Sequence, residues 1–418
     1  MATVTIRTGK WCGDKDLPLR FPDNWQPTVY ESQDPRSLSD PELESALDEP
    51  IGSRQIEQLA TGKQTAAIIV DDLSRPTPAH EVIPHVLKRL KAGGIRDDSI
   101  RFVVGGGAHR PLTQDEIAKK VGKTVAATYE VHNHNVFSGN LQGMGNLEDG
   151  TPVYINDVVA RSELKIGIGG ITLHPGAGFG GGGKIVAPGI AGYTTIAYNH
   201  GLFKGRARGS IEREGTEKDI RENAEDIARH VGLDLMVNVV FNGKSEIAGL
   251  YAGKVVEAHR QGATFAKQVY DTVIPSKDVE ETDIVVINAY PQDYDPVQMG
   301  KSLWPSKVFD KALKVIIDPA SDGIFYHGMS HRMDYGRFLR TKAREPQQVS
   351  IPAIPKIASK DTFVLLSSSF PKALFYSRYT DGALFETWND VVDQLGKLFD
   401  RANVAVIPYA PIQLPSVV

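Results

Sequence analysis

The residues best suited to chemistry form a glycine-rich run that ends in a lysine and has a histidine on either side. Six glycines lie between His174 and Lys184, and His200 follows a short way on. Glycine has no Cβ and tolerates positive φ, so such a run lets backbone amides approach a ligand closely. A terminal lysine can bind a phosphate or form a covalent bond, and histidines act as acid/base groups or metal ligands. This run therefore predicts a site for a cofactor, a metal or both.

The same run comes close to the phosphate-binding P-loop pattern. Gly178, Gly183 and Lys184 have the P-loop spacing, but Ile185 stands where the magnesium-binding serine or threonine belongs. A nucleotide triphosphatase is therefore disfavoured, and a phosphate-bearing cofactor held by glycine amides is the better prediction. The alternative without a ligand is a glycine-rich turn with a solvent-exposed lysine.

A second polar group follows a β-branched run. Asp71 and Asp72 come directly after that run, and Ser74 and Thr77 are expected to cap the helix that follows. Arg75 offers a planar pair of donors that matches a carboxylate or a phosphate. A capped turn with a surface ion pair is the structural alternative to an anion site.

A third group places His109 after three glycines at 105–107, which clear space around its ring. An isolated histidine is more often structural than catalytic, but the similar settings of His174 and His200 favour a functional role. His327 and His331 are candidates for a lid or a substrate contact. The remaining histidines lack such settings and are predicted to be structural or surface residues: His80, His85, His132, His134, His230 and His259.

A fourth group is formed by Gln298 and Lys301, which are three residues apart on a predicted helix and so share a face. An amide and an ammonium side by side suit a carboxylate. A solvated helix face is the alternative.

Composition limits the class of protein. The chain has 418 residues, 41% of them hydrophobic and 23% charged, with a net charge of −4. These values are typical of a globular enzyme and do not favour nucleic acid or a membrane as partner. We expect a cytoplasmic protein without a signal peptide or a membrane span. Because Cys12 is the only cysteine, a metal must rely on histidine, carboxylate or a ligand that arrives with a cofactor.

The elements that position these groups alternate between strands and helices. Such alternation predicts an α/β fold with mainly parallel sheets, in which ligands bind beyond the carboxyl ends of the strands. The first three groups all follow predicted strands. We expect two α/β domains, with the active site in the cleft between them. The predicted division is 1–272 for an N-terminal cofactor-binding domain, 273–405 for a smaller C-terminal domain, and 406–418 for a tail that returns to the first.

Taken together, the motifs resemble the nickel-dependent lactate racemase family of 2-hydroxy acid racemases and epimerases. They occur in the family's order and span most of the chain: Asp-Asp-x-Ser-Arg-Pro-Thr-Pro at 71–78, Gly-x-x-His-Arg at 106–110, Gly-Thr-Pro-Val at 150–153, His-x-x-Ala-Gly-Phe-x-Gly-Gly-x-Lys at 174–184, Pro-Gly-Ile-Ala at 188–191, His200, and Gln-x-x-Lys at 298–301.

The resemblance implies a nickel-pincer nucleotide, a pyridinium mononucleotide whose nickel is held by carbon and two sulfurs. Lys184 would attach it covalently and His200 would be the protein ligand of the nickel. The cofactor phosphate would lie among Asp72, Ser74, Gly182 and Gly183. The resemblance also implies His109 and His174 as paired acid/base residues, and Arg75, Gln298 and Lys301 as ligands of the substrate carboxylate.

The activity implied is inversion at C2 of a small 2-hydroxy acid through a 2-keto acid, with transient hydride transfer to the cofactor. Two bases are needed because each enantiomer presents its hydroxyl on a different side. Partners would be cofactor maturation enzymes: a carboxylase, a sulfur transferase and a nickel insertase. An oligomer is compatible with the sequence.

The chain departs from the family pattern at two places. Ser74 stands where threonine is common, and Ile324 to His327 replace an expected glycine–histidine pair. The second change bears on the substrate, and malate-like, aromatic and sugar-acid substrates all stay open. Two other classes also stay open: a nickel-free enzyme that uses a phosphate cofactor or nucleotide, and a non-catalytic protein that binds a hydroxy acid or the cofactor.

Overall fold

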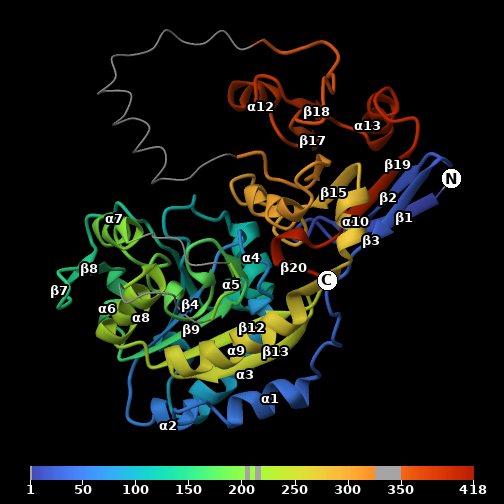
Figure 1. The fold of residues 1–418 in the computed structure, drawn as a ribbon. Helices are drawn as coiled ribbons and strands as arrows, with labels where there is room; N and C mark the ends of the chain where they lie inside the picture. The colour runs from blue at the N-terminus through green and yellow to red at the C-terminus, as the bar shows by residue number, and fades with distance from the viewer. Residues whose placement is uncertain (1, 203–207, 212–217, 325–349) are drawn as a thin grey trace. The chain divides into compact units, whose positions relative to one another are not determined.

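The computed structural model describes residues 2–202, 208–211, 218–324 and 350–418, and these form two compact units. The first unit comprises residues 35–268. The second unit combines residues 2–34 with the described residues from 269 to the C-terminus. Figure 1 shows both units and labels many of their helices and strands. Within the described residues, no helix is long and apolar enough to cross a membrane.

The first unit is built on a six-stranded sheet in the order β13-β12-β9-β4-β5-β6. Its strands from β12 to β6 are parallel, and β13 pairs antiparallel to β12 at one edge. The strands of this sheet are β4 (Ala66–Val70), β5 (Ile100–Val104), β6 (Glu130–Asn133), β9 (Leu164–Gly170), β12 (Leu235–Phe241) and β13 (Ile247–Gly253). Two short hairpins accompany it, β7 (Gln142–Asn146) with β8 (Pro152–Ile155), and β10 (Leu173–His174) with β11 (Gly178–Phe179).

Helices follow most of these strands, as the alternating pattern of the sequence predicts. They are α1 (Asp40–Asp48), α2 (Ile56–Ala60), α3 (Ala79–Ala92), α4 (Gln114–Val121), α5 (Lys123–Thr128), α6 (Asp157–Arg161), α7 (Tyr193–Gly201), α8 (Ile220–Val231) and α9 (Val255–Tyr270), with 3-10 helices η1 (Asp97–Ser99) and η2 (Gly182–Ile185). The apolar spacing that predicts a helix around Ile83 to Leu90 corresponds to α3, which ends before Gly93.

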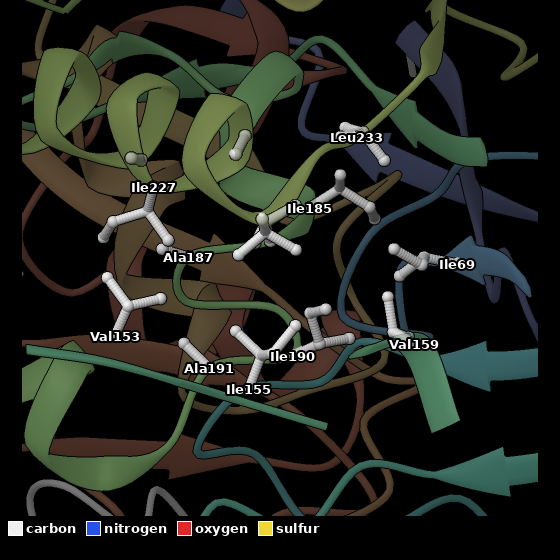
Figure 2. Close-up of a cluster of buried hydrophobic side chains, with 14 of the residues drawn as sticks. Ile69, Val153, Ile155, Val159, Ile185, Ala187, Ile190, Ala191, Ile227 and Leu233 are labelled. Atoms are coloured by element: carbon white, nitrogen blue, oxygen red, sulfur yellow. The ribbon is translucent and has the colours of Figure 1, made fainter. Parts of the chain in front are cut away.

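Part of the first unit's core is made by the segment directly after Lys184. Ile185, Ala187 and Ile190 are buried together with Ile69 of β4 and Ile227 of α8, and Figure 2 shows these side chains converging. Burial of such side chains stabilises a fold by about 1.5–3 kcal/mol each. The segment that carries the lysine is therefore anchored by the core on its C-terminal side.

The second unit contains a six-stranded sheet in the order β18-β17-β16-β15-β19-β3, in which every pair is parallel. Its strands are β3 (Trp25–Val29), β15 (Ile284–Asn288), β16 (Leu313–Ile317), β17 (Val364–Leu366), β18 (Ala383–Phe385) and β19 (Ala402–Ile407). Alternate residues of β15 enter different clusters: Ile284 and Val286 lie in one, and Val285 and Ile287 in another. Both faces of this sheet are therefore covered, as is usual for parallel sheets.

The remaining elements of the second unit are short. They are β1 (Ala2–Thr8), β2 (Lys15–Phe21), β14 (Asp271–Ile274), β20 (Leu414–Val417), α10 (Ser276–Glu281), α12 (Lys372–Arg378), α13 (Trp388–Leu395), η3 (Gln298–Leu303), η4 (Pro305–Val308) and η5 (Ala410–Ile412). The predicted α/β fold with mainly parallel sheets is thus confirmed.

The boundaries within the chain differ from the expected 1–272, 273–405 and 406–418. Residues 1–34 belong with the C-terminal sheet, because β3 adds to its edge beside β19. The tail also stays in this unit, since β20 pairs with β14. Both pairings join residues far apart in the sequence, which local patterns do not reveal.

Candidate active site

The three turns singled out in the first half of the sequence meet at one edge of the first unit's sheet. Strands β9, β4 and β5 are neighbours and run parallel. The segments that hold His174, Asp72 and His109 follow their carboxyl ends. Ligands bind at this edge in open α/β sheets. The topology therefore confirms that the turns share the edge where a ligand is expected.

A short contact joins the turn after β4 to the turn after β5. The carboxylate of Asp72 lies 2.6 Å from Nδ1 of His109. The Ser74 hydroxyl donates to the other carboxylate oxygen of Asp72 and lies 3.2 Å from the same histidine nitrogen. Arg75 Nη1 donates to the Ser74 hydroxyl at 2.9 Å. Four of the predicted site residues thus form one connected cluster.

The charge of Asp72 determines which ring nitrogen of His109 carries the proton. Burial would raise the pKa of its carboxyl, but the charge and hydrogen bond of His109, together with Arg75 and Ser74, hold that pKa well below its usual range. An ionised carboxylate only accepts hydrogen bonds. Nδ1 of His109 therefore carries the proton, and Nε2 is the atom able to accept a proton from a ligand.

Asp71, the neighbour of Asp72, has a structural role. Its carboxylate accepts hydrogen bonds from Lys120 Nζ at 2.7 Å, from the Thr77 hydroxyl at 2.6 Å and from the backbone N–H of Gly170 at 3.1 Å. Lys120 is fully buried and also donates to the carbonyls of Arg75 and Thr77, each at 3.1 Å. One buried ion pair thus fixes the turn that carries Asp72 and Arg75.

The expectation that Ser74 and Thr77 cap the next helix was wrong. The residue before α3 is Pro78, which has no side-chain cap hydrogen bond. Thr77 donates to Asp71 and Ser74 to Asp72 instead. The two hydroxyls therefore stabilise the turn rather than the helix, because each donates to a carboxylate of that turn and α3 begins only after Pro78.

Replacing Lys120 by methionine tests this ion pair. We expect unfolding to become easier by about 3–5 kcal/mol, because a buried charge on Asp71 is left without its counterion. Urea unfolding of the variant and the wild type measures the difference. The double variant Lys120→Met with Asp71→Asn removes both charges and should recover part of the loss. A single variant as stable as the wild type would contradict the structural role.

The glycine-rich run forms a tight turn that only glycine fits. Gly181 and Gly182 have φ of +80° and +55°. A Cβ on Gly183 would lie 2.7 Å from the carbonyl oxygen of Ala224, well inside contact distance. The run then enters η2, a single 3-10 turn, rather than the α-helix that follows a P-loop. The structure thus adds to the argument against a nucleotide triphosphatase.

Lys184 sits in η2 and is only partly exposed. Loss of hydration, and then the positive charge of Arg75, lower the pKa of its ammonium to about 7 against the opposing charge of Asp219. A substantial fraction of Lys184 is therefore an uncharged amine at neutral pH, which is the nucleophilic form.

His200 lies in the last turn of α7, and its ring contacts the backbone carbonyl of Ile196, four residues earlier. Its Nδ1 lies 3.0 Å from the oxygen of Ile196, so Nδ1 donates and Nε2 keeps the lone pair that a metal needs. Desolvation, followed by the positive charge of Lys184, lowers the pKa of His200 to about 4. His200 is exposed, which weakens the desolvation effect, but the charge of Lys184 lowers the pKa in the same direction. His200 is therefore neutral at physiological pH.

The charge of Arg75 lowers the pKa of Lys184, and the charge of Lys184 lowers the pKa of His200. His174 ends β10 and is paired with Gly178 of the glycine-rich run.

Gln298 and Lys301 belong to the second unit. They lie on η3, a 3-10 helix rather than the expected α-helix. Residues three apart eclipse one another in a 3-10 helix, so the two still share a face. His327 and His331 lie outside the described residues.

The described residues contain no group of three or more histidine, cysteine or carboxylate side chains placed to hold a metal ion.

Two residues at this site were missed by sequence reasoning. Lys120 shares the apolar face of α4 with Ile117 and Val121, all three buried. His259 of α9 is also buried and contacts the carbonyl of Gly180. A polar residue on an apolar helix face was the available signal in both cases.

Comparison with known proteins identifies the family of this chain. Residues 12–210 match the family model described as the lactate racemase N-terminal domain. A protein of Lactiplantibacillus plantarum named lactate racemase is 33% identical over 321 residues, which is 74% of each chain. The chain belongs to the lactate racemase family of isomerases.

Other members and structures agree with this family. A protein of Thermoanaerobacterium thermosaccharolyticum named lactate racemase is 28% identical over 317 residues, covering 73% of this chain and 70% of that protein. The solved lactate racemase apoprotein of that organism aligns with a TM-score of 0.72 at 21% identity, covering 99% of this chain and 100% of the other. A protein of Thermotoga maritima aligns with a TM-score of 0.63 at 17% identity over 93% of this chain and 100% of the other. These structural likenesses show the fold.

Proposed function

We propose that this protein is a nickel-dependent racemase or epimerase that inverts C2 of a small 2-hydroxy acid. The observation that carries the proposal is the hydrogen-bonded group of Asp72, His109, Ser74 and Arg75 at the carboxyl edge of one parallel sheet. Family membership directs the choice of reaction.

The acid/base work falls to the two histidines. His109 Nε2 would take the proton of the substrate hydroxyl, since its Nδ1 is held by Asp72. The cation that forms on the ring is stabilised by the ionised carboxylate, as in other Asp–His pairs. His174 would serve the opposite enantiomer. Loss of this proton from oxygen, together with loss of hydride from C2, would give a 2-keto acid. Return of hydride to the other face of C2 and of a proton to oxygen would complete the inversion.

The residues present fit the nickel-pincer nucleotide of the family. Lys184 would attach it through its amine, and His200 Nε2 would bind the nickel. Gly183 would lie near its phosphate, whereas the N–H of Gly182 already donates to Asn238. When bound, this cofactor would accept hydride from C2 and return it. We assign Ser74 to the same surroundings and Asp72 to orienting His109, because a buried carboxylate would repel a phosphate.

The substrate would be held by its carboxylate. Arg75 offers a planar donor pair within the cluster, and its Nη1 already contacts Ser74. Gln298 and Lys301 are proposed as further carboxylate ligands, and their shared face on η3 supports this. Lactate is the first substrate to test, because the curated relatives bear that name.

The proposal extends to partners and location. Maturation of the cofactor would require a carboxylase, a sulfur transferase and a nickel insertase in the same cell. We propose a cytoplasmic enzyme that acts on small molecules and binds neither nucleic acid nor membrane, in keeping with its net charge of −4.

Replacing Asp72 by asparagine should lower kcat by about 10²–10⁴-fold. The amide cannot stabilise the imidazolium and can leave His109 in the wrong tautomer. Initial rates from each enantiomer measure the loss, and mass spectrometry checks that cofactor loading is unchanged. Ser74→Ala is the matched control, because it removes a hydroxyl but keeps the Asp72–His109 pair, and a smaller loss is expected. An Asp72→Asn enzyme within about twofold of the wild type would rule out the orienting role.

The reaction itself is tested by incubating the loaded enzyme with single enantiomers of 2-hydroxy acids and separating the products by chiral chromatography. We expect at least one acid to be converted from either enantiomer to the same mixture. Fully loaded enzyme that inverts no hydroxy acid would favour a non-catalytic binding protein instead.

A further inference from the structure

We propose that His259 is a positioning residue that holds the backbone of the glycine-rich run and so places Lys184 for covalent attachment. The identity of the attached group rests on the proposed function, but the effect on Lys184 itself does not. His259 lies on α9, outside every motif that points to the reaction, and it is 1% exposed.

The first support is direct contact with the run. The Nε2 atom of His259 lies 2.8 Å from the carbonyl oxygen of Gly180. Its ring also packs against Gly182, where an added Cβ would come within 3.0 Å of two ring carbons. One side chain thus makes both a hydrogen bond and a close contact with the turn that precedes Lys184.

The second support is that hydrogen bonds to both ring nitrogens fix one tautomer of His259. Arg260 Nη1 lies 2.9 Å from Nδ1 of His259, and a guanidinium has donors only. Nδ1 therefore accepts, so Nε2 carries the proton and donates it to Gly180. Arg260 is in turn fixed by two hydrogen bonds to Glu225 of α8, at 2.7 and 2.9 Å.

Helix α8 and strand β12 also contact the glycine-rich run. A Cβ on Gly183 would lie 2.8 Å from the Cα of Glu225. The N–H of Gly182 donates to Asn238 of β12 at 2.9 Å, and the N–H of Lys184 donates to the carbonyl of Gly181 at 3.2 Å. The backbone path from Gly180 to Lys184 is therefore bound at nearly every residue.

The consequence concerns the charge of Lys184. The pKa of its amine is lowered to about 7 mainly because the surrounding protein keeps water away. If the run loosens, water reaches the amine and the pKa moves back toward its ordinary value of about 10.4. Loss of the His259 contact should therefore make Lys184 more basic and less reactive at neutral pH.

The test measures Lys184 directly in the apoenzyme. Trace acetylation with acetic anhydride from pH 6 to 10, followed by peptide mass spectrometry, gives the titration midpoint of this one amine. His259→Phe keeps the packing but removes the donor, and we expect the midpoint to rise by at least about one pH unit. His259→Gln restores an N–H donor near the position of Nε2 and should return the midpoint toward that of the wild type.

Two further variants keep the test decisive. His85→Phe is the matched control, because His85 pairs with Glu44 away from the run, and it should lower stability without moving the midpoint. If His259→Phe does not fold, Arg260→Met is used in its place. We expect it to raise the titration midpoint of Lys184 by a smaller amount. An unchanged midpoint in a folded His259→Phe or Arg260→Met enzyme would overturn the proposal.

The loaded protein separates this proposal from the proposed function. Produced with the maturation enzymes, His259→Phe should carry less adduct at Lys184 than the wild type, and His259→Gln should recover it. If the wild type carries no adduct while the apoenzyme midpoints shift as expected, the cofactor assignment fails and the role of His259 stands. If the wild type is loaded and the midpoints do not move, the cofactor assignment stands and the proposed role of His259 fails.

Discussion

Replacing Lys184 by alanine is expected to abolish covalent attachment of the cofactor and to reduce racemisation to background. The amine that forms the bond is removed, and alanine offers no other nucleophile. Intact-protein mass spectrometry and a chiral product assay on the same preparation measure both effects. Because Lys184 lies in a turn anchored by Ile185, Ala187 and Ile190, we expect the variant to fold normally.

Lys184→Arg is the matched control for this prediction. It keeps a positive side chain of similar length, but a guanidinium stays charged in proteins and is not nucleophilic, so it should also remain unloaded. Full activity in the alanine variant would contradict the role of Lys184 in holding the cofactor.

The same residue predicts a pH dependence. Its pKa lies near 7, lowered from the ordinary value by desolvation and by Arg75. The uncharged fraction therefore grows as pH rises through about 7 and is nearly complete above about 8. The rate of cofactor attachment to apoenzyme should rise and level off over this range. A rate that rises only toward pH 10 would show that Lys184 is an ordinary solvated lysine.

The second large effect is expected when His109 or His174 is replaced by alanine. Each single variant should lose about 10²–10⁴-fold in kcat, because one of the two proton transfers loses its catalyst. For a substrate with one stereocentre the equilibrium constant is one, so kcat/KM must fall equally in both directions. Steady-state rates therefore show the loss but do not show which histidine serves which enantiomer.

Single-turnover experiments make that assignment. Loaded enzyme is mixed with one enantiomer, and the 2-keto acid is trapped as its phenylhydrazone. His109→Ala should still oxidise one enantiomer and fail with the other, and His174→Ala should show the opposite preference. Nickel content should stay at the wild-type level in both variants, since His200 is intact. Normal turnover in both variants would show that the base assignment is wrong.

Much of the fold can be predicted from the sequence because its strands are short β-branched runs with clear ends. The runs that end at Val70, Val104 and Ile168 all correspond to strands of one sheet. Parallel pairing then places their following turns together, which is why Asp72 and His109 could be assigned to one site. What local patterns do not contain is the pairing of β3 with β19, which takes residues 1–34 into the second unit.

The parts of the site that escaped prediction depend on contacts between distant elements. Sequence spacing suggested that Thr77 caps a helix, but α3 begins after Pro78 and the Thr77 hydroxyl donates to the buried Asp71 that pairs with Lys120. His259 looked like one apolar-face residue among others, and only the packing of α9 against Gly180 and Gly182 gives it a role. Both cases involve a polar group whose partner lies on another element.

The most direct test of the account is peptide mass spectrometry of Lys184 in protein produced together with the maturation enzymes, paired with a racemisation assay on the same sample. The account predicts an adduct on Lys184 that contains nickel and sulfur, in proportion to activity. An unmodified Lys184 in a preparation that fully racemises a 2-hydroxy acid would contradict it.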